Sequence, residues 1–159
     1  MNSKLRFGFL LAIIVLASAL QLKSEMLSQQ EILDLVNLDR AQYGLPSLTL
    51  NPTLNLAALA KAEDMLSNNY FAHTSPAGTT PWHWLKAFGY NYTYAGENLA
   101  EGYQAADELQ KSWMASDTHR ANILSPYYSD VGLAVVTYNN TNLVVQMFGS
   151  KDIRVTFQK

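Results

Sequence analysis

Three ionisable side chains occur in polar segments of the sequence where packing does not obviously require them. His73 lies in "NNYFAHTSPAGTT", Glu97 lies between Gly96 and Asn98, and His119 lies in "SDTHRANIL". Two imidazoles and one carboxylate are the ligands of an open zinc site, in which water takes the fourth position. The three residues are far apart along the chain, so their spacing alone does not decide whether the fold brings them together.

His119 stands where the sequence predicts the start of a short helix. Ser116 ends the preceding helix and can cap the next turn, which puts His119 at the third helical position. A cation in the first turn opposes the positive end of the helix dipole, so we expect a lowered pKa and a neutral imidazole that can bind metal or act as a base. The alternative is that His119 only helps to cap the helix.

Four residues are expected to support this trio. Arg120 is predicted to pair with a carboxylate or to bind loop carbonyls rather than to take part in chemistry. Asn122 is expected to make backbone hydrogen bonds that hold the loop after its helix. Asn98, next to Glu97, and Asp117, at the start of the same helix as Arg120, complete the set.

Helix start and stop signals predict two helices in the first part of the chain. Ser28 and Glu31 form a capping-box pattern, and Gly44 ends that helix. Asn51 and Pro52 open the second helix, as its N-cap and first helical residue. The apolar face of the second helix comprises Leu54, Ala58, Ala62 and Met65.

Two further helices precede the one that carries the second histidine. Thr80 and Pro81 start a short helix, which is expected to bury Trp82 or Trp84 rather than expose both. Residues 104–115 form the longer one, with apolar residues one turn apart.

The remaining apolar segments are predicted to form strands. Alternating tyrosines over residues 90–94 suit a strand that then enters a glycine-flanked turn around Glu97. Residues 130–150 hold two apolar runs around an Asn-rich turn, which predicts an antiparallel hairpin. Both faces of the first hairpin strand are apolar, so helices must cover the sheet on two sides. The sequence therefore predicts an α+β protein, a three-layer α/β/α sandwich with a central, mainly antiparallel sheet.

The composition indicates one folded domain. The chain has 159 residues, 48% of them apolar and 15% charged, with a formal net charge of -2. This composition argues against a disordered chain and against nucleic-acid binding. The absence of cysteine excludes thiol catalysis and cysteine-based metal sites. Residues 28–150 are expected to form the domain, and residues 151–159 a C-terminal tail or an edge strand.

The N-terminus has the three-part plan of a secretory signal, with cations in "MNSKLR", the apolar run "FGFLLAIIVL" and then small residues. We expect residues 1–19 to be a signal peptide cleaved after Ala19, followed by a linker over residues 20–27. An uncleaved anchor that tethers the protein to the membrane is the alternative, although the apolar run is shorter than the roughly 20 residues that span a bilayer. The protein is therefore expected to be secreted or held in the cell envelope.

Several sequence blocks, in order, resemble the CAP superfamily, whose domain is also called the SCP domain. This superfamily takes in cysteine-rich secretory proteins, antigen 5 and pathogenesis-related proteins. The resemblance runs from about Ser28 to Gly149 and is greatest to the prokaryotic, cysteine-free branch. The blocks are "NLDRAQYGLPSLTLNPTLNLAALAKAEDM", "FAHTSPAG", "AGENLAEGY", "SWMASDTHRANIL", and "VGLAVV" leading to "VVQMFGS".

The resemblance implies an α/β/α sandwich with a central cleft in which histidines and acids converge, and which holds zinc in some relatives. His73 of "FAH" matches the first cleft histidine, and Glu97 of "GEN" matches the first cleft acid. His119 of "HRANIL" matches the histidine typical of prokaryotic members. The second histidine of eukaryotic members has no match in "VGLAVV", and Asp117 is the one candidate for the second cleft acid. Eukaryotic-type zinc coordination would therefore require His119 to fill the gap.

We interpret the sequence as that of an exported module that binds a metal, a lipid or a cell-wall component through His73, Glu97 and His119. A non-catalytic role is favoured because no recognisable nucleophile accompanies the trio. Zinc or another divalent cation is the cofactor that such a site would take. One alternative is a zinc-dependent hydrolase or peptidase that uses the same cleft. The other alternative is a structural or protein-interaction module.

Overall fold

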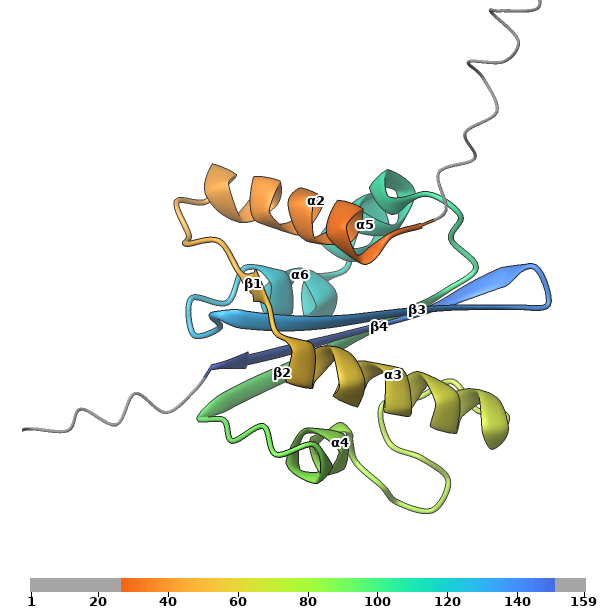
Figure 1. The fold of residues 1–159 in the computed structure, drawn as a ribbon. Coiled ribbons are helices and arrows are strands. Elements are labelled where there is room, and N and C mark those ends of the chain that lie inside the picture. Colours follow the sequence, from red (N-terminus) through yellow and green to blue (C-terminus); the bar gives the residue numbers. More distant parts are fainter. Residues whose placement is uncertain (1–26, 151–159) are drawn as a thin grey trace, which may run out of the picture.

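The computed structural model describes residues 27–150 of the chain (Figure 1). Those residues contain five helices and one four-stranded sheet. The predicted signal peptide or anchor, the tail over residues 151–159 and all of the linker except Leu27 lie outside the described residues. No helix within residues 27–150 has the length and apolar character that a membrane crossing requires.

The sheet is mixed but mainly antiparallel, and its strand order is β1-β3-β4-β2. β3 (Asp130–Tyr138) and β4 (Thr141–Ser150) form the predicted hairpin. β2 (Tyr94–Glu101) pairs antiparallel with β4, while β1 (Thr49–Leu50) runs parallel to β3. β2 is therefore one edge of the sheet.

Two asparagines make the hairpin turn between β3 and β4. Asn139 has a φ of 46° and Asn140 a φ of 61°, so both adopt the left-handed conformation. A two-residue turn of this kind fits the twist of the flanking strands, and asparagine tolerates the conformation better than most residues. The Asn-rich turn predicted from the sequence is confirmed.

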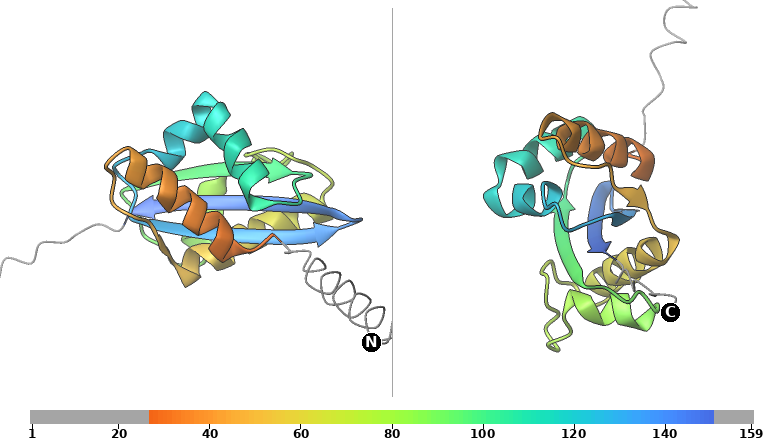
Figure 2. Two further views of the ribbon diagram at one scale, coloured as in Figure 1. Left: turned by 90° about the horizontal axis from the view of Figure 1, so that it is seen from above. Right: turned by 90° about the vertical axis from the view of Figure 1, so that its left-hand side faces the viewer.

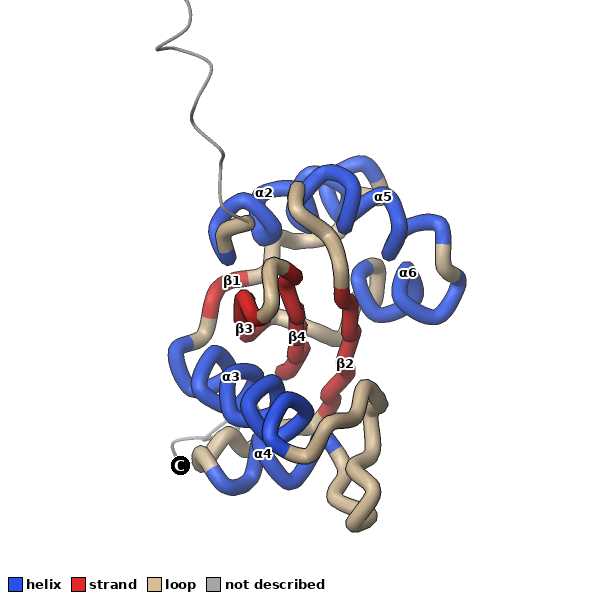
Figure 3. The backbone as a smooth tube through the Cα atoms, turned by 90° about the vertical axis from the view of Figure 1, so that its right-hand side faces the viewer, coloured by secondary structure: helices blue, strands red, loops and turns tan. Residues whose placement is uncertain are grey.

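One face of the sheet is covered by α3 (Pro52–Ser67) and α4 (Pro81–Ala87) (Figure 1, Figure 3). The side chain of Asn51 accepts hydrogen bonds from two backbone amides of the first turn of α3, as predicted for its N-cap. α3 lies so close to β3 that a Cβ atom on Gly132 would be 2.2 Å from the carbonyl carbon of Leu54. The glycine therefore permits the close packing of this helix on the sheet.

The opposite face is covered by α2 (Gln29–Gln42), α5 (Ala106–Ala115) and α6 (Asp117–Ile123) (Figure 2). Ser28 Oγ accepts a 3.1 Å hydrogen bond from the amide of Glu31, so the predicted N-cap of the first helix is confirmed. The two helical layers bury separate apolar clusters against the two faces of the sheet. The three-layer α/β/α sandwich is the observed architecture.

The prediction that Glu97 lies in a turn is wrong. Glu97 is the fourth residue of β2. The adjacent Gly96 is needed for a different reason, because a Cβ atom there would lie 2.6 Å from Tyr128 Oη and 2.9 Å from Asn122 Oδ1. In this strand, glycine marks the close approach of another segment, which the sequence pattern does not distinguish from a turn.

Two smaller expectations about helices also change. In α4 the fully buried apolar side chain is that of Leu85, whereas Trp82 and Trp84 are both half-buried. Thr80 and Ser116 occupy N-cap positions, but neither side chain makes a capping hydrogen bond within the described part of the chain. Backbone geometry and packing alone therefore set the start of these two short helices.

Candidate functional site

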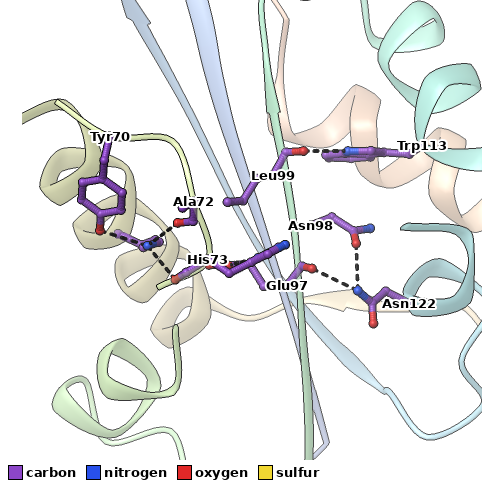
Figure 4. Close-up of polar contacts among 9 residues, drawn as sticks. Tyr70, Ala72, His73, Glu97, Asn98, Leu99, Trp113 and Asn122 are labelled. Carbon is purple, nitrogen blue, oxygen red and sulfur yellow. Dashed lines mark hydrogen bonds and ion pairs between the residues drawn. The ribbon is translucent and has the colours of Figure 1, made fainter. Parts of the chain in front are cut away.

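The fold brings His73 and Glu97 together across the surface of the sheet. His73 Nδ1 lies 2.6 Å from Glu97 Oε1 (Figure 4). The carboxylate comes from the middle of β2 and its side chain is only 2% exposed, whereas the imidazole comes from the loop after α3 and is 58% exposed. A buried acid thus holds one nitrogen of a histidine that faces solvent.

The pleat of β2 decides which side of the sheet each neighbour of Glu97 faces. Successive side chains of a strand point to opposite faces. Leu99, on the same side as Glu97, packs in the apolar cluster formed with α3 and α4. Asn98 points the other way, where its Nδ2 donates to Gln146 Oε1 at 3.0 Å and to the carbonyl of His119 at 3.3 Å. Glu97 is therefore directed toward the α3 layer and away from α6.

The pair holds a proton more tightly than either group would alone in water. The hydrogen bond to Glu97 is the main reason that the pKa of His73 is raised, although burial and the Lys61 charge oppose the rise. Burial is the main reason that the pKa of Glu97 is raised, and it outweighs the attraction of His73 and Lys61. The bond to Glu97 orients the imidazole and leaves Nε2 as the nitrogen that can meet a ligand.

A pocket of about 360 Å³ opens beside this pair. Glu97 Oε2 is buried and has no hydrogen-bond partner among the described residues, which is unusual for a buried carboxylate oxygen. The pocket offers hydroxyl, amide and imidazole groups together with an indole wall. Its lining residues include His73, Thr74, Thr80, Trp82, Glu97 and Asn122.

His119 lies beyond the edge of β2 and lines a different pocket. It is the third residue of α6, as predicted, and its ring centroid is 6.5 Å from that of Trp113. This second pocket, of about 350 Å³, is also lined by Phe71, Tyr103 and Trp113. The pKa of His119 is lowered, as expected, with burial as the main cause and the charge of His73 as the second.

The three predicted site residues do not form a zinc site with three protein ligands. Within residues 27–150, no group of three histidine and acidic side chains is placed to hold a metal ion. Glu97 Oε1 is already hydrogen-bonded to His73, and His119 lines the neighbouring pocket. The donor set therefore does not fit the open zinc site that the residue types suggested.

Of the supporting residues, Arg120 behaves as predicted and Asp117 does not enter the site. Arg120 Nη2 lies 2.5 Å from Asp117 Oδ1, and Nη1 donates to the carbonyl of Met114 at 2.9 Å. The Asp117 side chain is 90% exposed, so it is not a second buried acid. The bond from Arg120 to Met114 links α6 to the end of α5.

Asn98 and Asn122 join α6 to β2. The carbonyl of Asn122 accepts a 3.2 Å hydrogen bond from the amide of Ser125, in the loop after α6, as predicted. Its side chain has a further role, because Nδ2 donates to the carbonyl of Glu97 at 3.0 Å and to Asn98 Oδ1 at 2.9 Å (Figure 4). Asn122 therefore fixes the backbone of the site's acid.

Lys61 is the residue of this site that the sequence analysis missed. It is fully buried, and its Nζ donates to the carbonyls of Ala72 and His73 at 2.9 Å each and to Tyr70 Oη at 3.0 Å. A signal was present, because Lys61 falls on the apolar face of α3, four residues before Met65. A lysine within an apolar stripe requires buried partners.

Comparisons with known proteins agree with this fold. The model of the cysteine-rich secretory protein family, CAP, matches residues 33–148. A Bacillus subtilis (strain 168) relative, the uncharacterized protein YkwD, is 40% identical over 108 residues, or 68% of this chain and 42% of the relative. The chain thus spans less than half the length of that relative.

Two solved structures are similar. An extracellular protein containing an SCP domain from Bacillus anthracis str. Ames is 32% identical with a TM-score of 0.68, over 77% of this chain and 40% of that one. An outer surface protein from Borrelia burgdorferi is 21% identical with a TM-score of 0.70, over 80% of this chain and 98% of that one, and shares the fold. The chain belongs to the cysteine-rich secretory protein (CAP) family and, having no cysteine, to its cysteine-free branch.

Proposed function

We propose that the protein acts outside the cytoplasm and binds a small polar ligand in the pocket beside His73 and Glu97. One observation carries the proposal: a buried carboxylate with an unpartnered oxygen orients a half-exposed imidazole at the wall of a pocket. Such a group is set to exchange hydrogen bonds with something that enters. The extracellular relative supports the location, and the N-terminal signal pattern agrees with it.

The chemistry of the pocket favours a polyhydroxy or amide-bearing ligand, such as a soluble fragment of the cell wall. Thr74, Thr80 and Asn122 supply hydroxyl and amide groups, and Trp82 supplies an aromatic surface on which a ring can pack. A long acyl chain would match these groups poorly, because it would cover them without returning hydrogen bonds. The predicted lipid is therefore the less suitable occupant of this pocket.

NMR titration of the isotope-labelled protein tests the proposal. The probes are a disaccharide-peptide wall fragment, a short-chain phospholipid and zinc chloride, each added separately. We expect the wall fragment to shift the His73 imidazole and Trp82 indole signals saturably. Glu97→Gln and His73→Ala should abolish that shift, while His83→Ala, an exposed histidine on α4, should leave it intact.

Other outcomes would redirect the function. Saturable shifts with zinc alone would restore the metal site, and shifts with the phospholipid alone would assign a lipid ligand. If no probe causes a saturable shift while His73→Ala lowers the melting temperature, the pair has a structural role. Metal-dependent cleavage of a peptide library, lost in His73→Ala, would support the hydrolase alternative instead.

A further inference from the structure

We propose that Lys61 is a positioning residue for His73, which fixes the loop from beneath and holds the imidazole against Glu97. The importance of this role for ligand binding rests on the proposed function. The role itself concerns only contacts within the protein, so it can be tested without a ligand. Within residues 27–150, the Lys61 ammonium makes no hydrogen bond to the imidazole ring, and Lys61 does not line the pocket. It acts on His73 through the backbone.

All three protons of the Lys61 ammonium are used in the interior. Two go to the carbonyls of Ala72 and His73, and the third goes to Tyr70 Oη. All three partners therefore belong to one short segment, residues 70–73. The ammonium also lies 4.7 Å from the centroid of the Tyr70 ring, within the range of a cation–π contact.

The loop has little else to hold it at this point. The loop after α3 is exposed at residues 71–74. Lys61, by contrast, belongs to a rigid sixteen-residue helix and is fully buried. Anchoring an exposed loop to a buried cation on a helix is an effective way to fix one side chain of that loop.

Two carboxylates oppose the effect of burial on Lys61. Burial is the main reason that the pKa of Lys61 is lowered, and the negative charges of Glu97 and Asp64 limit the fall. Asp64 in turn accepts a hydrogen bond from the Tyr70 hydroxyl. The charge of the buried lysine thus interacts with two carboxylates, one of which is the acid of the site. An apolar side chain would suit the α3 stripe but would leave the loop carbonyls without these donors.

The test is the His73 imidazole pKa, measured by NMR in the absence of any ligand. Two roles for Lys61 predict opposite signs in Lys61→Met. If Lys61 positions the loop, the hydrogen bond to Glu97 weakens and the His73 pKa falls toward its ordinary value of 6.5. If Lys61 acts only by its charge, removing a nearby cation raises the His73 pKa.

Matched variants complete the design. Lys111→Met removes an exposed lysine that pairs with Asp107, and it should leave the His73 pKa unchanged. Lys61→Arg keeps the charge and the donors, and should recover a raised His73 pKa at least in part. An unchanged or increased His73 pKa in folded Lys61→Met would overturn the proposal.

A measurement on the wild-type protein covers the case in which Lys61→Met does not fold. Buried, hydrogen-bonded ammonium protons exchange slowly with water, so Lys61 should give a resolved Nζ–H signal with contacts to residues 72 and 73. A rapidly exchanging Lys61 ammonium would refute the proposal. Because neither experiment uses a ligand, failure of the pocket to bind any probe leaves both results interpretable.

Discussion

Trp113 Nε1 donates a 3.3 Å hydrogen bond to the carbonyl oxygen of Leu99, so a side chain of α5 closes the outer edge of β2 (Figure 4). Trp113 is also almost fully buried. The bond lies two residues from the carbonyl of Glu97, which Asn122 of α6 holds in the same way. Two helices thus use side-chain donors to fix the backbone on both sides of Asn98.

Trp113→Phe is expected to destabilise the fold, because it leaves the buried carbonyl of Leu99 without its donor. The loss of such a bond typically costs about 1–3 kcal/mol. Urea unfolding followed by circular dichroism measures the change in the free energy of unfolding. Trp84→Phe is the matched control, because the Trp84 indole nitrogen is buried without a partner among the described residues. Equal losses in the two variants would show that the Leu99 bond contributes nothing beyond packing.

The raised pKa of His73 predicts that stability falls as the pH rises above the ordinary value of 6.5. The folded state binds the His73 proton more tightly than the unfolded state does. This contribution is therefore complete below the unfolded pKa and is lost as the pH passes through the folded one. Thermal melts between about pH 5 and pH 8 should show the decline in the wild type and a shallower one in His73→Ala. Identical slopes would argue against the His73–Glu97 bond.

The lowered pKa of His119 predicts the opposite slope in a lower pH window. The folded state binds this proton more weakly, so stability is lost as the pH falls below 6.5 toward the folded pKa. The same melts should show a shallower acid-side loss in His119→Ala than in the wild type. Equal acid-side losses in the wild type and His119→Ala would argue against a lowered His119 pKa.

Gly96→Ala is expected to destabilise the protein by crowding Tyr128. The new methyl group would meet Tyr128 Oη at 2.6 Å, and such overpacking typically costs about 1–3 kcal/mol. Removing the hydroxyl with Tyr128→Phe should recover part of the loss in the double variant. Additive effects of the two substitutions, measured by urea unfolding, would mean that the strain lies elsewhere.

Much of the fold could be predicted because its signals are local. The Asn51 cap, the Asn139–Asn140 turn and the apolar runs of the hairpin each depend on neighbours in the chain. The position of Glu97 was predicted wrongly because Gly96 is required by the close approach of Tyr128, which is distant in sequence. Local chemistry alone does not contain that contact.

The site was predicted in part for the same reason. His73 and Glu97 were selected from their motifs and do meet, whereas His119 lines a different pocket beyond the edge of β2. The pleat of β2 turns Glu97 toward the α3 layer, and this direction could not be assigned while Glu97 was expected in a turn. Lys61 was missed because two of its three partners are backbone carbonyls, which side-chain types do not reveal.

The closed edge of β2 has a further consequence for a protein expected to act outside the cytoplasm without disulfides. Exposed strand edges are templates on which other chains add strands and aggregate. In β2, the carbonyls of Glu97 and Leu99 are occupied by side chains of α6 and α5. At the opposite edge, β1 is only two residues long, and the carbonyl and amide of Leu133 in β3 bond to the side chains of Gln29 and Asn55. At both edges of the sheet, side chains of the helices therefore occupy backbone groups that could otherwise pair with a strand of another chain.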